Sequence, residues 1–172
     1  MWLDKKSDFQ QYINQSEIGD KNIGVKTNCF IVGSKEQFKS IHTLLGSCVG
    51  FCGYHKQTGI GFVVHIFSKI NEKENVEILG KIIKELEQVL KNDFELNFND
   101  LELFIGYRDK LLMYQVYGGE NIKKSQKLII ETIKQITKQN NIKEIILGDR
   151  SIKLCLNLIN GKVSAVLKSN SY

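Results

Sequence analysis

The chain has 172 residues and a formal net charge of +5, with 42% hydrophobic and 25% charged residues. This length suits one domain that can bury about two thirds of its unfolded surface, and the composition excludes a disordered tail, a collagen-like fibre and a disulfide-rich miniprotein. The charge comes from 22 Lys and 2 Arg interleaved with 19 acidic residues, whereas nucleic-acid readers favour Arg and cluster their basic residues. We therefore expect one folded domain over residues 1–172 and no nucleic-acid partner.

The apolar residues give no sign of a targeting or membrane segment. The opening MWLDKKSDFQQ is charged, with no apolar stretch behind it, so we expect neither a signal peptide nor an anchor. The most apolar region, 44–67, is interrupted by HKQT, so it lacks the run of about 18 apolar residues that a spanning helix needs. Without an export signal, the cysteines at positions 29, 48, 52 and 155 are expected to be reduced thiols in the cytoplasm.

In the first half of the chain, the hydrophobic pattern predicts strands followed by a helix. Residues 24–32 alternate apolar and polar side chains, which is typical of a strand. The apolar runs 48–54 and 60–67 flank HKQTG and predict a β-hairpin. Residues 75–91 place apolar side chains at three- and four-residue steps, so they predict an amphipathic helix.

The second half of the chain repeats this alternation. Residues 101–107 and 111–117 predict a second hairpin, and 121–139 a second long helix. The Asn160-Gly161 pair predicts a type I′ turn between the last two strands. The final strands are expected at 144–147, 153–159 and 162–167. Hairpins combined with two long helices indicate an α+β fold, a layered sandwich of mixed, largely antiparallel sheets with the helices on one outer face.

The predicted hairpin brings a thiol and an imidazole together. If residues 55–58 form the loop, Cys48 stands opposite His65, with Cβ atoms about 4.5–5.5 Å apart; a five-residue loop instead leaves Cys48 diagonal to His65. An adjacent imidazole lowers the pKa of a thiol and so produces a nucleophile. The small residues Gly46 and Ser47 before Cys48 permit a tight turn whose N–H groups can point at an oxyanion.

Two other interpretations of these residues stand beside the catalytic one. Cys48 and His65 could simply be packed in the core, as a lone Cys and His in apolar strands usually are. Alternatively, His42, Cys48, Cys52 and His55 are residue types that bind zinc. In a strand, however, Cys48 and Cys52 would lie about 13 Å apart, too far to share one ion.

A longer stretch of the sequence resembles a known family. Residues 43–67 (TLLGSCVGFCGYHKQTGIGFVVHIF) resemble the signature of the CheD-type chemoreceptor glutamine deamidases, in which a nucleophilic Cys follows Gly-Ser and a His comes seventeen residues later. The Gly118-Gly119 pair and residues 146–163, which include Gly148 and Arg150, resemble further parts of that family. The resemblance covers about 24–167, with 1–23 as an N-terminal extension, and implies a layered α/β sandwich.

The resemblance also implies an activity. The protein would be a cysteine hydrolase that converts glutamine side chains of chemoreceptors to glutamate with release of ammonia. Cys48 would be the nucleophile and His65 the proton carrier, with the backbone at Gly46 and Ser47 binding the oxyanion. No metal ion or organic cofactor is required by such a reaction.

Two departures from the family pattern bear on the imidazole. The family carries a catalytic Thr five or six positions before the Cys, where this chain has Thr43 and His42. We take Thr43 as the residue that orients His65, although a slip of one position on a strand would turn it to the opposite face. The family also has a Pro soon after the His, where this chain has Phe67-Ser68-Lys69.

The partners that the resemblance implies are the cytoplasmic helices of chemoreceptors, as substrate, and a CheC-type phosphatase. They indicate a cytoplasmic protein of chemotaxis adaptation that does not insert into the membrane. The alternative is a binding module that docks on receptors and regulates such a phosphatase with weakened catalysis.

Overall fold

The computed structural model describes residues 8–11, 13–19, 21–68, 72–108, 119–147 and 151–167. Its helices and strands, in chain order, are η1 (Gln15–Glu17), β1 (Asn22–Gly24), β2 (Cys29–Ser34), β3 (Ser40–Leu44), β4 (Val49–His55), β5 (Ile60–Ile66), α1 (Glu72–Phe94), η2 (Phe98–Asp100), β6 (Glu102–Arg108), α2 (Gly119–Thr137), β7 (Lys143–Leu147), β8 (Ser151–Asn157) and β9 (Val163–Leu167). No helix among these residues is long and apolar enough to cross a membrane.

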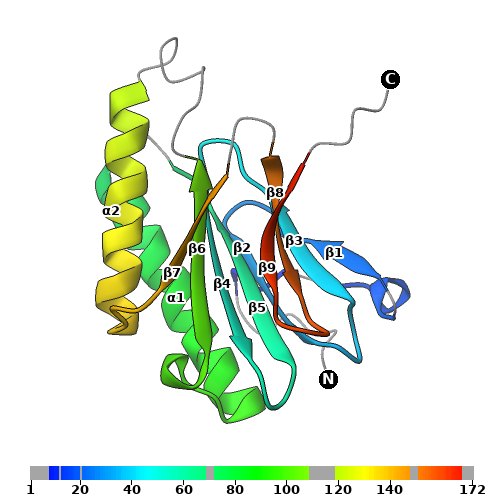
Figure 1. Ribbon diagram of the computed structural model, residues 1–172. Coiled ribbons are helices and arrows are strands. Elements are labelled where there is room, and N and C mark those ends of the chain that lie inside the picture. Colours follow the sequence, from blue (N-terminus) through cyan, green and yellow to red (C-terminus); the bar gives the residue numbers. More distant parts are fainter. Residues whose placement is uncertain are drawn as a thin grey trace, which may run out of the picture.

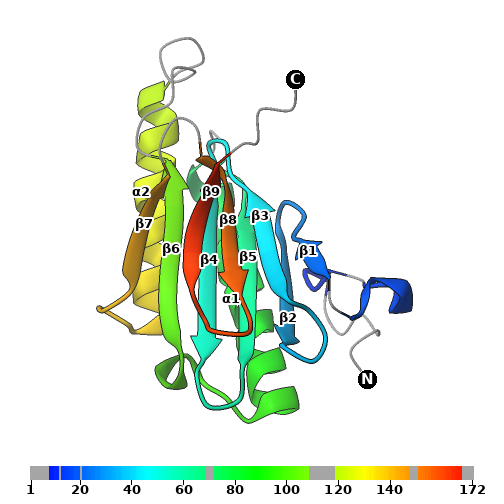
Figure 2. The same cartoon turned by 45° about the vertical axis from the view of Figure 1, so that its right-hand side comes forward.

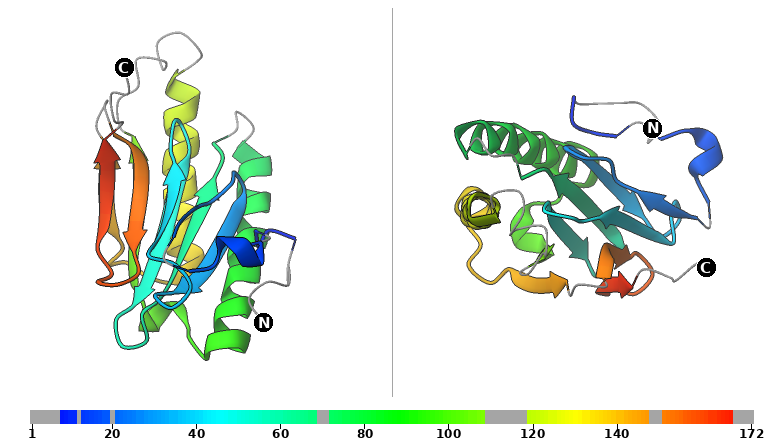
Figure 3. Two further views of the ribbon diagram at one scale, coloured as in Figure 1. Left: turned by 90° about the vertical axis from the view of Figure 1, so that its right-hand side faces the viewer. Right: turned by 90° about the horizontal axis from the view of Figure 1, so that it is seen from above.

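The strands form two sheets that pack face to face (Figure 1). A large sheet has the order β2-β5-β4-β6-β7, and a small sheet has the order β1-β3-β8-β9. The β1–β3 and β6–β7 pairs are parallel, and the other neighbours are antiparallel. Helices α1 and α2 cover one face of the large sheet and the small sheet covers the other (Figures 2 and 3). The predicted α+β fold with its helices on one outer face is therefore confirmed.

The side-chain alternation of the strands explains the three layers. In β5, Phe62, Val64 and Ile66 pack against the helices, whereas Val63 packs against the small sheet. Successive side chains of a strand point to opposite faces, so an apolar strand such as this one needs cover on both sides. His65 lies two residues after Val63 in the same strand, so its side chain also faces the small sheet.

The strand predicted over residues 24–32 is wrong as a single element. The chain ends β1 at Gly24, turns, and begins β2 at Cys29 in the other sheet. At the turn, Asn28 adopts a left-handed conformation with φ 55°, which Asn tolerates better than most residues. The alternation seen in the sequence therefore spans two strands separated by this turn.

The hairpin over residues 48–67 is confirmed, but its register differs from both predicted ones. The loop between β4 and β5 is 56–59, so Tyr54 pairs with Gly61 and Gly50 pairs with His65. The loop closes with Gly59 at φ 70°, a conformation that Gly adopts at no steric cost. Cys48 consequently lies two residues before the residue opposite His65, on the same face of the strand.

Three further predictions have different outcomes. Both long helices are confirmed, with α1 extending beyond the predicted 75–91 at both ends. The predicted second hairpin needs residues 111–117, which lie outside the described residues; β6 pairs instead with β4 and, in parallel, with β7. The type I′ turn is wrong, because the β8–β9 loop is longer than two residues and of the Asn160-Gly161 pair only Gly161 has a positive φ, 73°.

Candidate active site

Three of the predicted site residues lie together between the two sheets. Cys48 precedes β4 and belongs to the apolar core that joins the sheets. His65 in β5 and Thr43 in β3 are buried, with 6% and 1% of their surface exposed. The end of β3, the start of β4 and the end of β5 therefore converge at one end of the space between the sheets.

The hydroxyl of Thr43 connects His65 to the segment that follows β1. Thr43 Oγ1 lies 2.7 Å from His65 Nδ1 and 3.2 Å from the carbonyl oxygen of Val25. A hydroxyl has one proton to donate, and a carbonyl can only accept. Thr43 therefore donates to Val25 and accepts from Nδ1, which assigns the imidazole tautomer whose Nε2 carries a lone pair.

The other ring nitrogen of His65 is the basic one, and it is unpaired. Nε2 is buried and has no hydrogen-bond partner in the part of the chain that the structure describes. In the β4–β5 ladder Gly50 stands opposite His65, so Cys48 is diagonal to it on the same face. Diagonal neighbours are about 7–8 Å apart, and the thiol makes no hydrogen bond to Nε2.

Burial keeps both groups in their neutral forms. It raises the pKa of the Cys48 thiol, and hydrogen bonds from the Ser68 backbone and the Ser47 side chain offset this rise only in part. Burial also lowers the pKa of His65, against the opposing effect of the Val25 carbonyl. At neutral pH the pair is therefore a thiol and an imidazole rather than a thiolate and an imidazolium.

A hydrogen bond from helix α2 holds the backbone of the residue before Cys48. Gln126 of α2 donates from Nε2 to the carbonyl oxygen of Ser47 over 2.8 Å. Gly46, on the other side of Ser47, is exposed, and a Cβ atom placed on it would meet no other atom within 4 Å. The backbone before Cys48 therefore has open space around Gly46 and a buried side-chain amide, that of Gln126, against the carbonyl of Ser47.

Asn28 fixes the end of β5, next to the imidazole. Its backbone N–H donates to the carbonyl oxygen of His65 over 2.7 Å. Its side-chain Oδ1 accepts the N–H of Phe67 over 3.1 Å. These two bonds restrain the chain at the end of β5 and directly after it.

His42 does not take the helper position. It alternates with Thr43 on β3 and faces away from the core, where it pairs across strands with Cys155 of β8. Its imidazole is half-buried over Gly24, and burial and the charge of Lys153 lower its pKa. Of the two candidates in the sequence, Thr43 is the one that contacts His65; its catalytic role stays a prediction.

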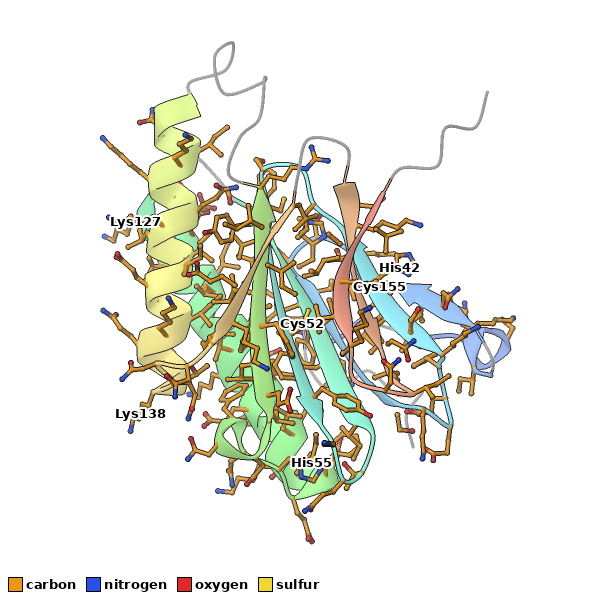
Figure 4. The ribbon with its side chains drawn as sticks, viewed as in Figure 1. His42, Cys52, His55, Lys127, Lys138 and Cys155 are labelled. Carbon is orange, nitrogen blue, oxygen red and sulfur yellow. The ribbon has the colours of Figure 1, made fainter. Side chains whose placement is uncertain are left out.

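The four residues considered as zinc ligands are spread over the molecule. Figure 4 shows His55 at the end of the β4–β5 hairpin, far from His42 on the small sheet. Cys52 is fully buried within the core, and burial raises the pKa of its thiol, with a smaller contribution from Cys155. Among the described residues, no three His, Cys, Asp or Glu side chains lie close enough to hold one metal ion.

The sequence did not indicate the roles of Val25, Asn28 and Gln126. Asn28 carried a weak signal, because Asn is enriched at left-handed positions, whereas a backbone carbonyl and a helical Gln carry none. Gly118, Gly148 and Arg150, which contribute to the resemblance, lie outside the described residues.

Comparison with family models and with curated proteins finds no match to this chain.

Proposed function

We propose that the protein is a cysteine amidohydrolase that deamidates glutamine side chains of chemoreceptors. The observation that supports this function best is the hydrogen bond from His65 to Thr43, which leaves Nε2 buried and without a partner among the described residues, on the face that carries Cys48. A histidine that served packing alone would be expected to satisfy both ring nitrogens, because an unpaired buried polar atom costs about 1–3 kcal/mol. An unpaired ring nitrogen is instead expected of an imidazole that takes up a proton during a reaction.

The charge states favour a general-base mechanism. Nε2 of His65 takes the proton of Cys48 as sulfur attacks the carboxamide carbon, and the oxygen of the tetrahedral intermediate becomes an anion. His65 then gives that proton to the nitrogen, which leaves as ammonia and produces a thioester. Water, deprotonated by His65, attacks the thioester; sulfur leaves as the thiol, and the product is glutamate. Contacts between a base and its nucleophile are often long before substrate binds, which fits the diagonal placement of Cys48.

The choice of substrate comes from the resemblance of residues 43–67 to the deamidase signature. A side-chain amide must reach a thiol that is 8% exposed, so an extended side chain on a protein surface suits the site. Phe67 is exposed beside the end of β5 and offers apolar surface to a helix that carries the glutamine.

A binding module that regulates a CheC-type phosphatase is the second candidate. The raised pKa of Cys48 and its lack of a hydrogen bond to His65 favour it, because both leave the resting thiol unreactive. Docking on receptors would then persist with little or no turnover.

Incubation with a chemoreceptor cytoplasmic fragment tests the two candidates. We expect conversion of glutamine to glutamate, scored by peptide mass spectrometry, with the wild type and with Cys155→Ala, and none with Cys48→Ala. Equal conversion by Cys48→Ala would overturn the proposal. No conversion by the wild type, together with retention of a CheC-type phosphatase in a pull-down, would favour the binding module.

A further inference from the structure

We propose that Gln126 is a positioning residue that holds the Ser47–Cys48 peptide so that the N–H of Cys48 faces the oxygen of the group under attack. The inference rests on the proposed thiol chemistry at Cys48. It assigns to helix α2 a part in the reaction, although α2 lies on the opposite side of the large sheet from the imidazole.

The contact between Gln126 and Ser47 joins two distant parts of the chain. Gln126 is 4% exposed, and its amide reaches the Ser47 carbonyl 79 residues earlier in the sequence. A buried Gln side chain loses considerable rotamer freedom on folding. Ordering the Gln126 amide against the Ser47 carbonyl is consistent with a role in fixing the orientation of that peptide.

Because the peptide bond is planar, the contact between Gln126 and the Ser47 carbonyl also sets the direction of the Cys48 N–H. In a trans peptide, the carbonyl of one residue and the N–H of the next point in opposite directions. Because the Ser47 carbonyl points at α2, the Cys48 N–H points away from α2. The Cys48 side chain also lies on the face away from the helices, so the thiol and its own N–H are directed to the same side.

The N–H of Cys48 is available for a substrate oxygen. It donates to no backbone carbonyl among the described residues, because the pairing of β4 with its neighbours begins at Val49 and Gly50. A preorganised N–H that meets the developing oxyanion is among the largest contributions to acyl transfer. Removal of one such donor typically lowers the rate by about 10² to 10³-fold.

The same peptide would be free to rotate without Gln126. Gly46 precedes Ser47 in a bend with open space around it, and Gly has the greatest backbone freedom of any residue. A rotated peptide would present the Ser47 carbonyl in place of the Cys48 N–H and so repel the oxyanion. The hydrogen bond from Gln126 prevents this rotation.

Two reagents separate the oxyanion contribution from the reactivity of the thiol. Alkylation of Cys48 by iodoacetamide forms no oxyanion, whereas its acylation by p-nitrophenyl acetate passes through one. Gln126→Met keeps the size of the side chain and removes the donor, and Gln126→Glu replaces the donor by an acceptor. Thr132→Val is the matched control, since the Thr132 hydroxyl bonds only to the Leu128 carbonyl within α2 in the described structure.

We expect Gln126→Met and Gln126→Glu to lower the acylation rate of Cys48, measured by mass spectrometry of that residue, by on the order of 10²-fold. Their alkylation rates, and the pH dependence of alkylation, should stay within about twofold of the wild type, and Thr132→Val should change neither reaction. A parallel fall in both reactions would show a general disturbance and overturn the inference. An unchanged acylation rate, or a wild type that is alkylated but not acylated, would overturn it too.

These outcomes are distinct from those of the proposed function. If receptor glutamines are not deamidated by the wild type but ester acylation depends on Gln126, the substrate assignment fails and the positioning role stands. If deamidation occurs and Gln126→Met acylates and deamidates at the wild-type rate, the positioning role fails and the proposed function stands.

Discussion

The hydroxyl of Thr43 lies 2.7 Å from Nδ1 of His65, although the two residues belong to different sheets. The imidazole is therefore oriented by the small sheet, while the thiol precedes a strand of the large sheet. The β4–β5 hairpin places His65 near Cys48, and the docking of the small sheet decides how the imidazole is oriented there.

Loss of the Thr43 hydroxyl should impair the reaction more than the fold. Thr43→Val keeps the shape of the side chain but removes the hydroxyl that bonds both Nδ1 and the Val25 carbonyl, so the imidazole loses the group that fixes its orientation. We expect kcat for receptor deamidation to fall by about 10²-fold, the lower end of what a positioned base contributes. Thr43→Ser, which retains the hydroxyl, should keep most of the activity, and equal losses in both variants would contradict the role.

The neutral charge state of the site predicts the pH dependence of thiol labelling. Burial raises the pKa of Cys48 above its ordinary value of 9.0, so the reactive thiolate is scarce at neutral pH and increases as the pH rises. Alkylation by iodoacetamide, followed by mass spectrometry from about pH 6 to about pH 10, should accelerate up to and beyond pH 9. A rate that is already constant at pH 7 would instead indicate a thiolate–imidazolium pair. Cys52, which is fully buried, should stay unlabelled while the protein is folded.

Protonation of His65 from solvent should set the pH below which activity falls. Burial lowers the pKa of His65 below its ordinary value of 6.5, so the imidazole stays neutral at pH 7 and gains its proton only under more acidic conditions. We expect kcat/KM for deamidation to be constant near pH 7 and to fall only below pH 6.5. An acid limb with its midpoint above 6.5 would contradict the neutral, buried imidazole.

Asn28 should contribute to stability in two separable ways. Asn28→Gly accommodates the left-handed backbone but loses the bond to the Phe67 N–H, at about 1 kcal/mol. Asn28→Ala loses the bond and also places an alanine at φ 55°, which costs about 1–2 kcal/mol more. Urea unfolding should therefore rank the wild type above Asn28→Gly and Asn28→Ala lowest. Equal stabilities of the two variants would show that the backbone conformation is not strained.

The close packing of the sheets depends on two glycines. Gly50 and Gly106 are paired across β4 and β6, and a Cβ on either would approach Leu154 Cδ2 of β8 to 2.6 or 2.7 Å. We expect Gly50→Ala to lower the free energy of unfolding by about 1–3 kcal/mol, measured by urea denaturation. Gly80→Ala, in the middle of α1 with nothing within 4 Å, is the control and should stabilise by about 0.5–1 kcal/mol.

The elements that the sequence predicts well depend on short-range patterns. The helix over residues 75–91 follows from side chains three and four positions apart, and the hairpin over 48–67 from two apolar runs and a short loop. The four-residue loop lies one position later in the chain than predicted, at 56–59, so the partner of each β4 residue moves by two. A shift of this size preserves the face of each side chain, so Cys48 and His65 stay on one face although they are diagonal rather than opposite.

The fold class follows from the sequence alone, because the periods of its helices and strands encode it. The common face of Cys48 and His65 follows from the sequence only for a four-residue loop, and the pairing of Gly50 with His65 in the folded chain decides it. The choice of Thr43 over His42 as the partner of His65, and the restraint of the backbone by Gln126 and Asn28, emerge only in the folded chain. These contacts arise when one sheet docks on another and a helix packs on the far face. Such docking depends on how buried side chains that are distant in the sequence fit together, and the hydrophobic period of a single helix or strand carries no information about that fit.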